Sequence, residues 1–257
     1  MKARHGNIAQ ITCLILILSL QGAAWASPSA NETATKSARH VLVVRQKTES
    51  MGPIELYLSD QAGHFSARGG ELTATCAAPD WNLVFYSKRR NLAFVASRAK
   101  MQQKSMGIFH RPPLEQGVRR RQRDSQLKLD TLKVTIDGSA DPEGSNDLVI
   151  FQARKSKRFK EIDFVVADHI SLNPNIQIFV NWLYDQSVFP GVPLEQKKYY
   201  TDGSASTVYR TTSITHADQP ASLFEYPKGY KRTANFLEVV LSEDAKSTLE
   251  HLWGDRK

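Results

Sequence analysis

Residues 191–232 read GVPLEQKKYYTDGSASTVYRTTSITHADQPASLFEYPKGYKR, and this stretch decides the fold. Two extended runs flank the pair Asp202-Gly203. This pair favours a tight hairpin because both residues tolerate positive φ. A proline-containing tail, PASLFEYPKGYK, follows the second run. The stretch therefore predicts two antiparallel strands followed by an extended tail.

A helix is expected just before this hairpin, over residues 174–185. Asn173 can cap its first turn, and Pro174 already has the φ that the first helical position requires. Four apolar residues then recur at helical spacing on one face: Ile176, Phe179, Val180 and Leu183. Two interpretations stay open, an ordinary helix packed on a sheet and a helix that covers a ligand cavity.

Upstream of this helix, short alternating segments predict further strands at 54–58, 72–77, 81–85 and 92–94. The segment 81–85 places Trp81, Leu83 and Phe85 on one face. Turns are expected at Gly63 and at 68–70.

The second half of the chain is less regular. Residues 100–123 contain Pro112-Pro113 and an arginine run, which predict a long irregular connection. Segments 127–129 and 132–136 alternate in opposite phase, so we expect a β-bulge near 130–131. Strands are expected again at 148–153 and 162–167.

The stretch 191–232 resembles the closing section of the LolA/LolB-like lipoprotein-carrier fold. In that fold a G-x-P leads into a strand, a polar turn and a second strand, and the section ends in P-x-x-L-F-x-x-P-x-G-Y, matched here by residues 220–230. The family also ends the preceding helix in an L-Y pair, here Leu183-Tyr184. The resemblance implies a mainly β domain, a curved antiparallel incomplete barrel with the helix on its concave side. It also implies an apolar hollow that accepts acyl chains.

The N-terminus has the pattern of an export signal. Lys2 and Arg4 are basic, residues 11–20 are apolar, and Ala24-Trp-Ala26 gives the small-x-small pattern before a cleavage site. We therefore expect a signal peptide at 1–26 and a periplasmic protein, with an extracellular location as a second possibility. A retained membrane anchor is the alternative. Residues 27–40 are expected to be disordered, and residues 41–257 to form a single LolA/LolB-like domain with a short C-terminal helix after Ser242.

The formal net charge of the whole chain is +8, and much of it comes from two clusters. The residues that we take from the first cluster are Arg119, Arg120, Arg121 and Arg123, and those from the second are Lys155, Lys157 and Arg158. A solvated loop and a hairpin tip explain them, and so does contact with an anionic membrane surface. An exported chain without a nucleic-acid-binding motif is not expected to bind nucleic acid.

Chemical motifs are scarce in this sequence. It contains no G-x-S-x-G, H-E-x-x-H, P-loop or G-x-G-x-x-G, so we expect no enzyme, catalytic residue, metal or cofactor. Asp168-His169 and the pair His216 and Asp218 could act as acid-base pairs or ligands, and a hydrolase alternative depends on the Asp168-His169 region. Cys76 is the only cysteine after the signal, and we interpret it as a buried thiol, with a reactive thiol as the alternative.

These observations predict an exported, soluble, monomeric carrier-like protein that binds the acyl chain of a lipid or lipoprotein. The expected lining residues are Trp81, Leu83, Phe85, Ile176, Phe179, Val180 and Leu183. Because aromatic and aliphatic side chains also build an ordinary core, the alternative is an envelope interaction module on the same scaffold without a ligand.

Overall fold

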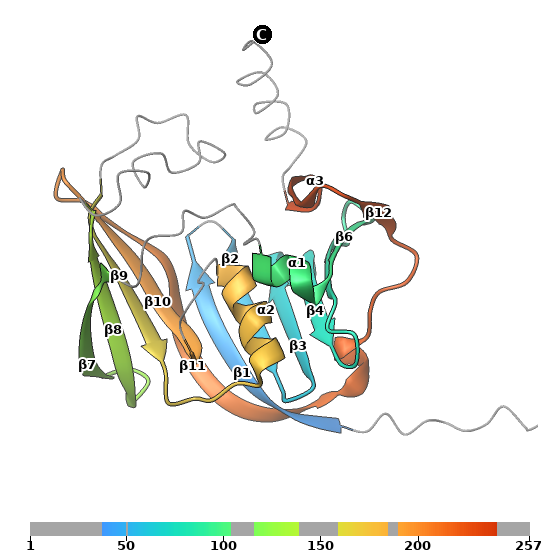
Figure 1. Ribbon diagram of the computed structural model, residues 1–257, viewed down its shortest axis with the longest axis horizontal. Coiled ribbons are helices and arrows are strands. Elements are labelled where there is room, and N and C mark those ends of the chain that lie inside the picture. The colour runs from blue at the N-terminus through green and yellow to red at the C-terminus, as the bar shows by residue number, and fades with distance from the viewer. Residues whose placement is uncertain (1–37, 50, 104–115, 139–158, 185–189, 241–257) are drawn as a thin grey trace, which may run out of the picture. The chain divides into compact units, whose positions relative to one another are not determined.

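The computed structural model describes residues 38–49, 51–103, 116–138, 159–184 and 190–240. These residues form a mainly β protein built on one twelve-stranded sheet, whose order is β12-β6-β5-β4-β3-β2-β1-β11-β10-β9-β8-β7. Every described pairing is antiparallel except that of β12 with β6, and the two end strands of the sheet do not pair with each other (Figure 1).

The elements follow one another along the chain with short connections. They are β1 (Ala38–Thr48), β2 (Gly52–Leu58), β3 (Ala62–Ala67), η1 (Arg68–Gly70), β4 (Leu72–Ala77), β5 (Leu83–Ser87), β6 (Leu92–Ala96), α1 (Arg98–Gln103), β7 (Val118–Asp124), β8 (Leu129–Asp137), β9 (Phe159–Ala167), α2 (Pro174–Tyr184), β10 (Val192–Tyr200), β11 (Ala205–Pro220), η5 (Ala221–Phe224), β12 (Lys231–Thr233) and α3 (Phe236–Val240). No helix in these described segments is both long and apolar enough to cross a membrane.

The hairpin predicted around Asp202-Gly203 is present as β10 and β11. Gly203 has a φ of 82°, whereas Asp202 does not take a positive φ, and the Gly203 amide donates to the Tyr200 carbonyl at 3.1 Å. The connection therefore spans residues 201–204 rather than two residues alone. β11 continues to Pro220 and pairs with β1 along its length, so the extended tail begins later than expected, with the 3₁₀ turn η5.

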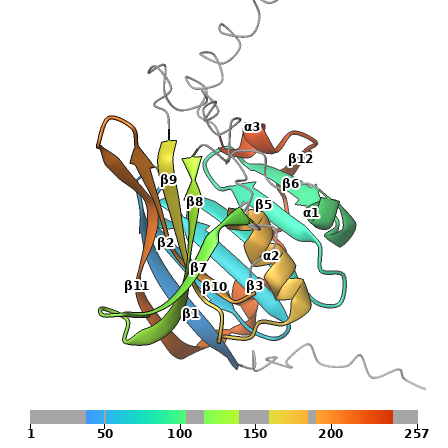
Figure 2. The same cartoon turned by 60° about the vertical axis from the view of Figure 1, so that its left-hand side comes forward.

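Helix α2 begins at the predicted residue. The Asn173 side-chain oxygen accepts a hydrogen bond from the Asn175 amide at 2.9 Å, which is the expected N-cap. The helix lies against the middle strands of the sheet (Figures 1 and 2). Gly63 on β3 allows this contact, because a Cβ at that position would lie 2.7 Å from Cδ1 of Phe179.

The turn predicted at Gly63 is therefore wrong, since Gly63 is an internal residue of β3. The turn falls at residues 59–61 instead, where the Ser59 hydroxyl accepts a hydrogen bond from the Ala62 amide at 3.0 Å. The predicted turn at 68–70 is confirmed as η1. Position 63 requires glycine because the Phe179 ring leaves no room for a Cβ, and not because the chain turns there.

The arginine run is also different from the prediction, because residues 118–124 form strand β7 rather than an irregular connection. β7 pairs in continuous register with β8, and the two strands are joined by a turn in which Lys128 has a φ of 59°. Asp124 Oδ1 accepts hydrogen bonds from the amides of Gln126 and Leu127 in this turn. Leu127 lies in this turn and not in a strand, so its spacing from Leu129 is not part of a strand alternation. The bulge predicted near 130–131 is absent from the β7–β8 register.

Two boundaries also differ from the sequence predictions. Trp81 precedes β5, which begins at Leu83, and has a φ of 54°. β1 begins at Ala38, which pairs with Pro220, so residues 38–40 belong to the sheet and not to a disordered segment. The predicted strand at 148–153, the helix after Ser242 and the N-terminal signal lie outside the described residues.

Candidate functional site

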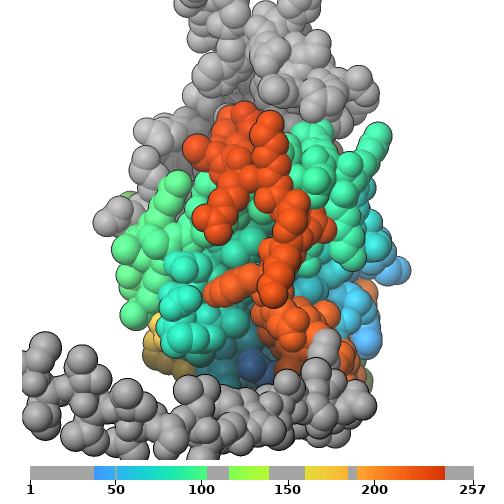
Figure 3. All heavy atoms as spheres, turned by 90° about the vertical axis from the view of Figure 1, so that its right-hand side faces the viewer, coloured from blue at the N-terminus to red at the C-terminus, as the bar shows by residue number. Residues whose placement is uncertain are grey.

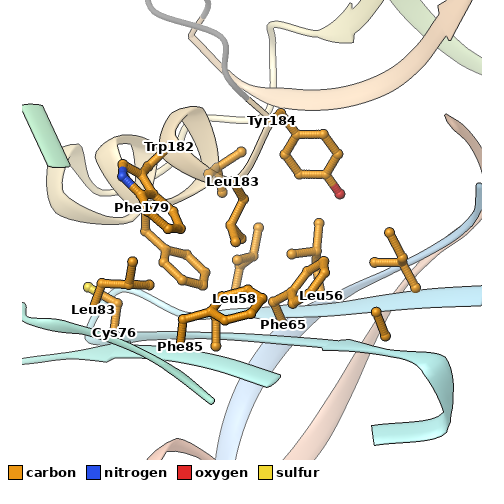
Figure 4. Close-up of a cluster of buried hydrophobic side chains, with 14 of the residues drawn as sticks. Leu56, Leu58, Phe65, Cys76, Leu83, Phe85, Phe179, Trp182, Leu183 and Tyr184 are labelled. Atoms are coloured by element: carbon orange, nitrogen blue, oxygen red, sulfur yellow. The ribbon is translucent and has the colours of Figure 1, made fainter. Parts of the chain in front are cut away.

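The residues expected to line an acyl site come together in the structure, but as a packed core. Leu83, Phe85 and the four apolar residues of α2 are buried, and Trp81 is half-buried against the same cluster. Figure 4 shows Leu83 and Phe85 on the strands facing Phe179 and Leu183 of α2, with Phe179 directed toward the sheet. The sequence predicted these residues as the lining of an acyl site, and the structure places them in or against the packed core between α2 and the sheet.

Aromatic rings make most of the contacts at one end of this core. Phe236 of α3 lies 4.8 Å from Phe85 and 5.4 Å from Trp182, measured between ring centroids, in edge-to-face geometry. Phe94 stacks on Trp182 at 6.5 Å. Such ring pairs add about 0.5–1.5 kcal/mol beyond the area they bury. The short helix α3, which the sequence did not predict, completes this part of the core.

A cavity of about 710 Å³, the helix-end cavity, opens beside this core at the N-terminal end of α2. None of the seven predicted residues lines it. Its apolar lining consists of Val41, Leu42, Leu58, Leu127, Leu129, Ile170, Leu172 and Ile214. Leu42 and Leu58 belong to the main core, and Leu127, Ile170, Leu172 and Ile214 pack against it. The cavity is therefore an extension of the core rather than a separate surface feature.

Polar residues also contribute to this cavity, including three histidines, His40, His169 and His216. The rings of His40 and His216 stack in parallel with centroids 5.4 Å apart, and His40 Nδ1 lies 3.1 Å from Asp218 Oδ1. Within the described residues, no group of three or more His, Cys, Asp or Glu side chains is arranged to hold a metal ion.

Asp168, on which the hydrolase alternative depends, forms an ion pair with Arg121 at 2.7 Å. A histidine base is assisted by a carboxylate that orients its imidazole and must lie within reach of a nucleophile. Cys76 is buried, its Sγ donates to the Trp81 carbonyl at 3.4 Å, and burial raises the pKa of the thiol to about 12. These surroundings fit an unreactive core thiol.

The basic residues of the first predicted cluster lie along β7, exposed at the end of the sheet. Arg121 pairs with Asp168 and Arg123 pairs with Asp130 at 3.0 Å, so part of the cluster's charge is balanced locally. The turn after β7 carries Gln126 and Leu127 into the lining of the helix-end cavity. The strand thereby brings basic side chains next to that cavity. Lys155, Lys157 and Arg158 lie outside the described residues.

A buried polar network fixes the other end of α2. The Tyr184 hydroxyl donates to the Gln46 side-chain oxygen. Gln46 Nε2 donates to the Pro193 carbonyl at 2.8 Å and to Thr211 Oγ1 at 3.0 Å. This network joins α2 to β1, β10 and β11, and burial raises the pKa of Tyr184 well above its usual value. The Leu183-Tyr184 pair entered the sequence analysis only as part of the family resemblance. In the structure, Tyr184 fixes the end of α2 to β1 through Gln46.

Comparisons with known proteins identify no family for this chain. No family model matches it, and no curated protein matches it. One similar solved structure is described as that of an uncharacterized conserved protein from Thermus thermophilus. It has a TM-score of 0.40 at 9% identity, and the match covers 76% of this chain and 89% of that one. A similarity this weak does not indicate a function for the protein.

Sequence reasoning missed the lining of the helix-end cavity, since its apolar residues come from segments around positions 42, 58, 127–129, 170–172 and 214. One local signal was available, because Leu172 directly precedes the capping Asn173, where an apolar residue commonly packs under a helix. The other residues become neighbours only through the sheet order.

Proposed function

We propose that the protein is an exported carrier that takes an acyl chain of a lipid or lipoprotein into the helix-end cavity. The observation that carries the proposal is a hollow of about 710 Å³ at the N-terminal end of α2, in which eight apolar residues that continue from the core lie beside ten polar ones. Its volume lies within the roughly 300–1,000 Å³ of typical ligand cavities.

The energetics of such a ligand support the proposal. Each buried methylene contributes about 0.8 kcal/mol, so about ten methylenes contribute on the order of 8 kcal/mol before the entropy costs of binding. No directed polar contact is then needed to hold the chain. This is consistent with a sequence that carries no short ligand-binding motif.

We also propose that the sheet is an incomplete barrel that curves around α2, as in the LolA/LolB-like fold. The open strand order and the near-complete antiparallel pairing support this architecture. So does the Phe179–Gly63 contact, which brings the helix close to the strands in both views of the molecule (Figures 1 and 2). The acyl chain would lie on the same side of the sheet as α2.

A matched pair of variants tests the site. Leu172→Glu places a carboxylate in the helix-end cavity, whereas Ile178→Glu places one on α2 at a half-buried position that packs on the same core without lining the cavity. Displacement of a fluorescent fatty acid should become at least about tenfold weaker for Leu172→Glu, because an unpaired charge is costly in an apolar site. Ile178→Glu should bind nearly as the wild type does.

Circular dichroism melting of both variants is the control for folding. Equal binding by the two variants, or no fatty-acid binding by the wild type, contradicts the proposal. Mass spectrometry of gently purified protein provides the independent readout, because a co-purified lipid is expected.

The basic strand β7 suggests where the carrier meets its membrane. We propose that Arg119 and Arg120, both exposed, attract the protein to anionic lipid headgroups. Each basic residue near such a surface contributes about 1 kcal/mol, and salt screens the attraction. Replacing both with Gln should weaken sedimentation with phosphatidylglycerol vesicles at low salt, while fatty-acid displacement remains unchanged. Unchanged vesicle binding would remove β7 from the proposal.

The second candidate is an envelope interaction module that binds no ligand. It is favoured by the dense packing of the predicted lining residues between β5 and α2. In that case the purified protein is free of lipid, and Leu172→Glu affects only stability.

A further inference from the structure

A second cavity lies on the other face of the sheet. It is an open cavity of about 610 Å³ bordered by residues of strands β2–β5 and by residues 222–228, which we call the tail segment. Figure 3 shows the C-terminal part of the chain crossing the strands on this side of the molecule. The lining residues Glu55, Tyr57 and His64 alternate with Ile54, Leu56 and Phe65, which face α2. We name this space the tail cavity.

The tail segment is fixed in place by contacts at its two sides. Phe224 is buried with Val41, Val43 and Ala62. The Tyr226 hydroxyl donates to the Asn82 carbonyl at 2.9 Å and accepts from the Ala77 amide at 3.3 Å. Because these contacts join the tail to β1, β3 and the β4–β5 connection, the tail segment forms a fixed wall of the cavity.

His64 supplies an unused hydrogen-bond acceptor beside this cavity. Its side chain is 7% exposed, and its ring donates to the backbone carbonyl of Leu223. Nδ1 is shielded from solvent and has no partner in the described part of the chain. Burial lowers the pKa of His64 to about 4, so the ring is neutral at neutral pH and Nδ1 carries a lone pair.

The residue opposite His64 in the sheet register is Thr75, whose buried hydroxyl also has no partner among the described residues. Buried polar atoms nearly always find a partner, and a shielded nitrogen acceptor can pair only with a donor held inside the site. Thr75 does not line the cavity, whereas His64 does, so a ligand hydroxyl in the cavity can donate a hydrogen bond to His64 Nδ1.

The charges of the tail cavity favour an anion. Glu55 accepts from the Tyr57 hydroxyl at 2.7 Å and from Arg45 Nε at 2.9 Å, so its charge is already compensated. The remaining charged lining residues are Lys88, Glu225 and Lys228, two positive and one negative. Lys88 has no ion-pair partner among the residues that the structure describes, and its Nζ lies 3.6 Å from the point where a Cβ on Gly70 would stand.

Hydroxyl groups complete the lining. Ser66, Thr73 and Tyr86 are consecutive cross-strand neighbours on β3, β4 and β5. We propose that the tail cavity binds a small hydroxylated anion, a sugar acid or a sugar phosphate. Lys88 holds the anionic group, and His64 Nδ1 accepts a hydrogen bond from a hydroxyl of the ligand. This site is separate from the helix-end cavity and does not depend on acyl binding.

Calorimetric titration with glucuronate, glucose phosphate and glucose tests the proposal on the mature protein. Glucuronate or glucose phosphate should bind, and neutral glucose should bind at least about tenfold more weakly, because hydrogen bonds to a charged group are the stronger ones. Binding of one anion alone identifies whether a carboxylate or a phosphate is recognised. Equal affinity for glucose and both anions, or no binding of any of the three at millimolar concentration, overturns the proposal.

Lys88→Gln and Arg89→Gln form a matched pair, because both side chains are exposed on the same turn and Lys88 alone lines the cavity. Anion binding should fall about tenfold in Lys88→Gln and stay unchanged in Arg89→Gln. Equal losses in the two variants would mean that general charge is responsible, which contradicts the site.

The His64 assignment has a readout that needs no variant. The NMR resonance of His64 Nδ1 in the wild-type protein should shift on saturation with the anion that binds. His64→Phe should lose binding, whereas His64→Gln, which keeps an acceptor oxygen, should retain part of it. A Nδ1 resonance that does not move on saturation removes His64 from the site.

Discussion

The two faces of strands β2–β5 differ in the side chains that they present, which are apolar on one face and mainly polar on the other. On the face toward α2, Leu56, Phe65, Ala74 and Phe85 are cross-strand neighbours in one row. On the face toward the tail segment, the next row is Glu55, Ser66, Thr73 and Tyr86. The first row is packed solid with side chains from α2 and α3, and the second borders a cavity.

This difference follows from the kinds of atoms that meet. Apolar side chains gain energy from any close contact, so a helix with aromatic and aliphatic residues fills the space completely. Polar side chains require partners at set distances and angles, and a covering segment cannot supply all of them. The polar face beside the tail segment keeps an open cavity and two buried atoms without a partner in the described residues, His64 Nδ1 and Thr75 Oγ1, and these features fit a ligand site.

The largest expected effect is on the apolar face. Phe179→Ala should lower the free energy of unfolding by about 3–5 kcal/mol, because it removes a fully buried ring and leaves a cavity. Chemical denaturation followed by fluorescence or circular dichroism measures the change. A loss below about 1 kcal/mol would show that the ring is not packed as described.

A double-mutant cycle with Gly63→Ala sharpens this result. Alone, Gly63→Ala should cost about 1–3 kcal/mol, because the new methyl group meets the Phe179 ring at 2.7–2.8 Å. In the Phe179→Ala background the same methyl group enters the space that the ring left. The two losses should then fall short of additivity, and full additivity would contradict the contact.

The next effect belongs to the polar face and depends on pH. His64 has a pKa near 4 in the folded protein against a usual value of 6.5, chiefly because of burial. The folded state therefore binds fewer protons than the unfolded state between these values. Stability is constant above about pH 6.5 and falls as the pH is lowered toward 4, by on the order of 3 kcal/mol.

His64→Gln is the control for this pH dependence, since it removes the titrating ring and should flatten the curve between pH 6.5 and 5. Glu55, whose pKa is lowered by its hydrogen bonds to Tyr57 and Arg45, affects stability only below about its usual value of 4.5. An unchanged slope above pH 5 in His64→Gln would assign the effect to other groups.

A third effect concerns the buried network at the end of α2. Tyr184→Phe removes the donor to Gln46 and leaves a buried amide oxygen without that partner. We expect a loss of about 1–3 kcal/mol in unfolding free energy, measured by denaturation. Tyr226→Phe, whose part-buried hydroxyl joins the tail segment to Asn82, serves as the comparison and should cost less, about 1 kcal/mol. A larger loss from Tyr226→Phe would reverse this ranking.

The elements that the sequence predicted correctly are those with local causes. α2 has its cap and its repeat within residues 173–183, and the hairpin of β10 and β11 has its glycine in the turn. Strand β7 was missed because its arginines show no alternation, and pairing with β8 alone makes it a strand.

The two cavities illustrate a similar limit. The polar alternation that forms the tail cavity is visible in 54–58, 64–66, 73–75 and 84–88. Its wall in the tail segment comes from residues more than a hundred positions later, so the cavity was not predictable. The expected acyl-site residues were correctly recognised as neighbours on α2 and β5, whereas the hollow beside them depends on the order of the strands.

The smallest expected effect is at the rim of the polar face, where Arg45 pairs with Glu55. Both side chains are well exposed, at 49% and 40%, so the pair should contribute at most about 1 kcal/mol. Arg45→Gln should lower stability by that amount or less at roughly 0.1 M salt, and the difference should vanish near 1 M salt, where screening acts within about 3 Å. Phe179→Ala is the contrasting variant, because its loss comes from packing and should persist at both salt concentrations. A salt-independent loss from Arg45→Gln would mean that Arg45 supports the neighbouring strands by packing. The charge of Arg45 would then not contribute to the difference between the polar and the apolar face.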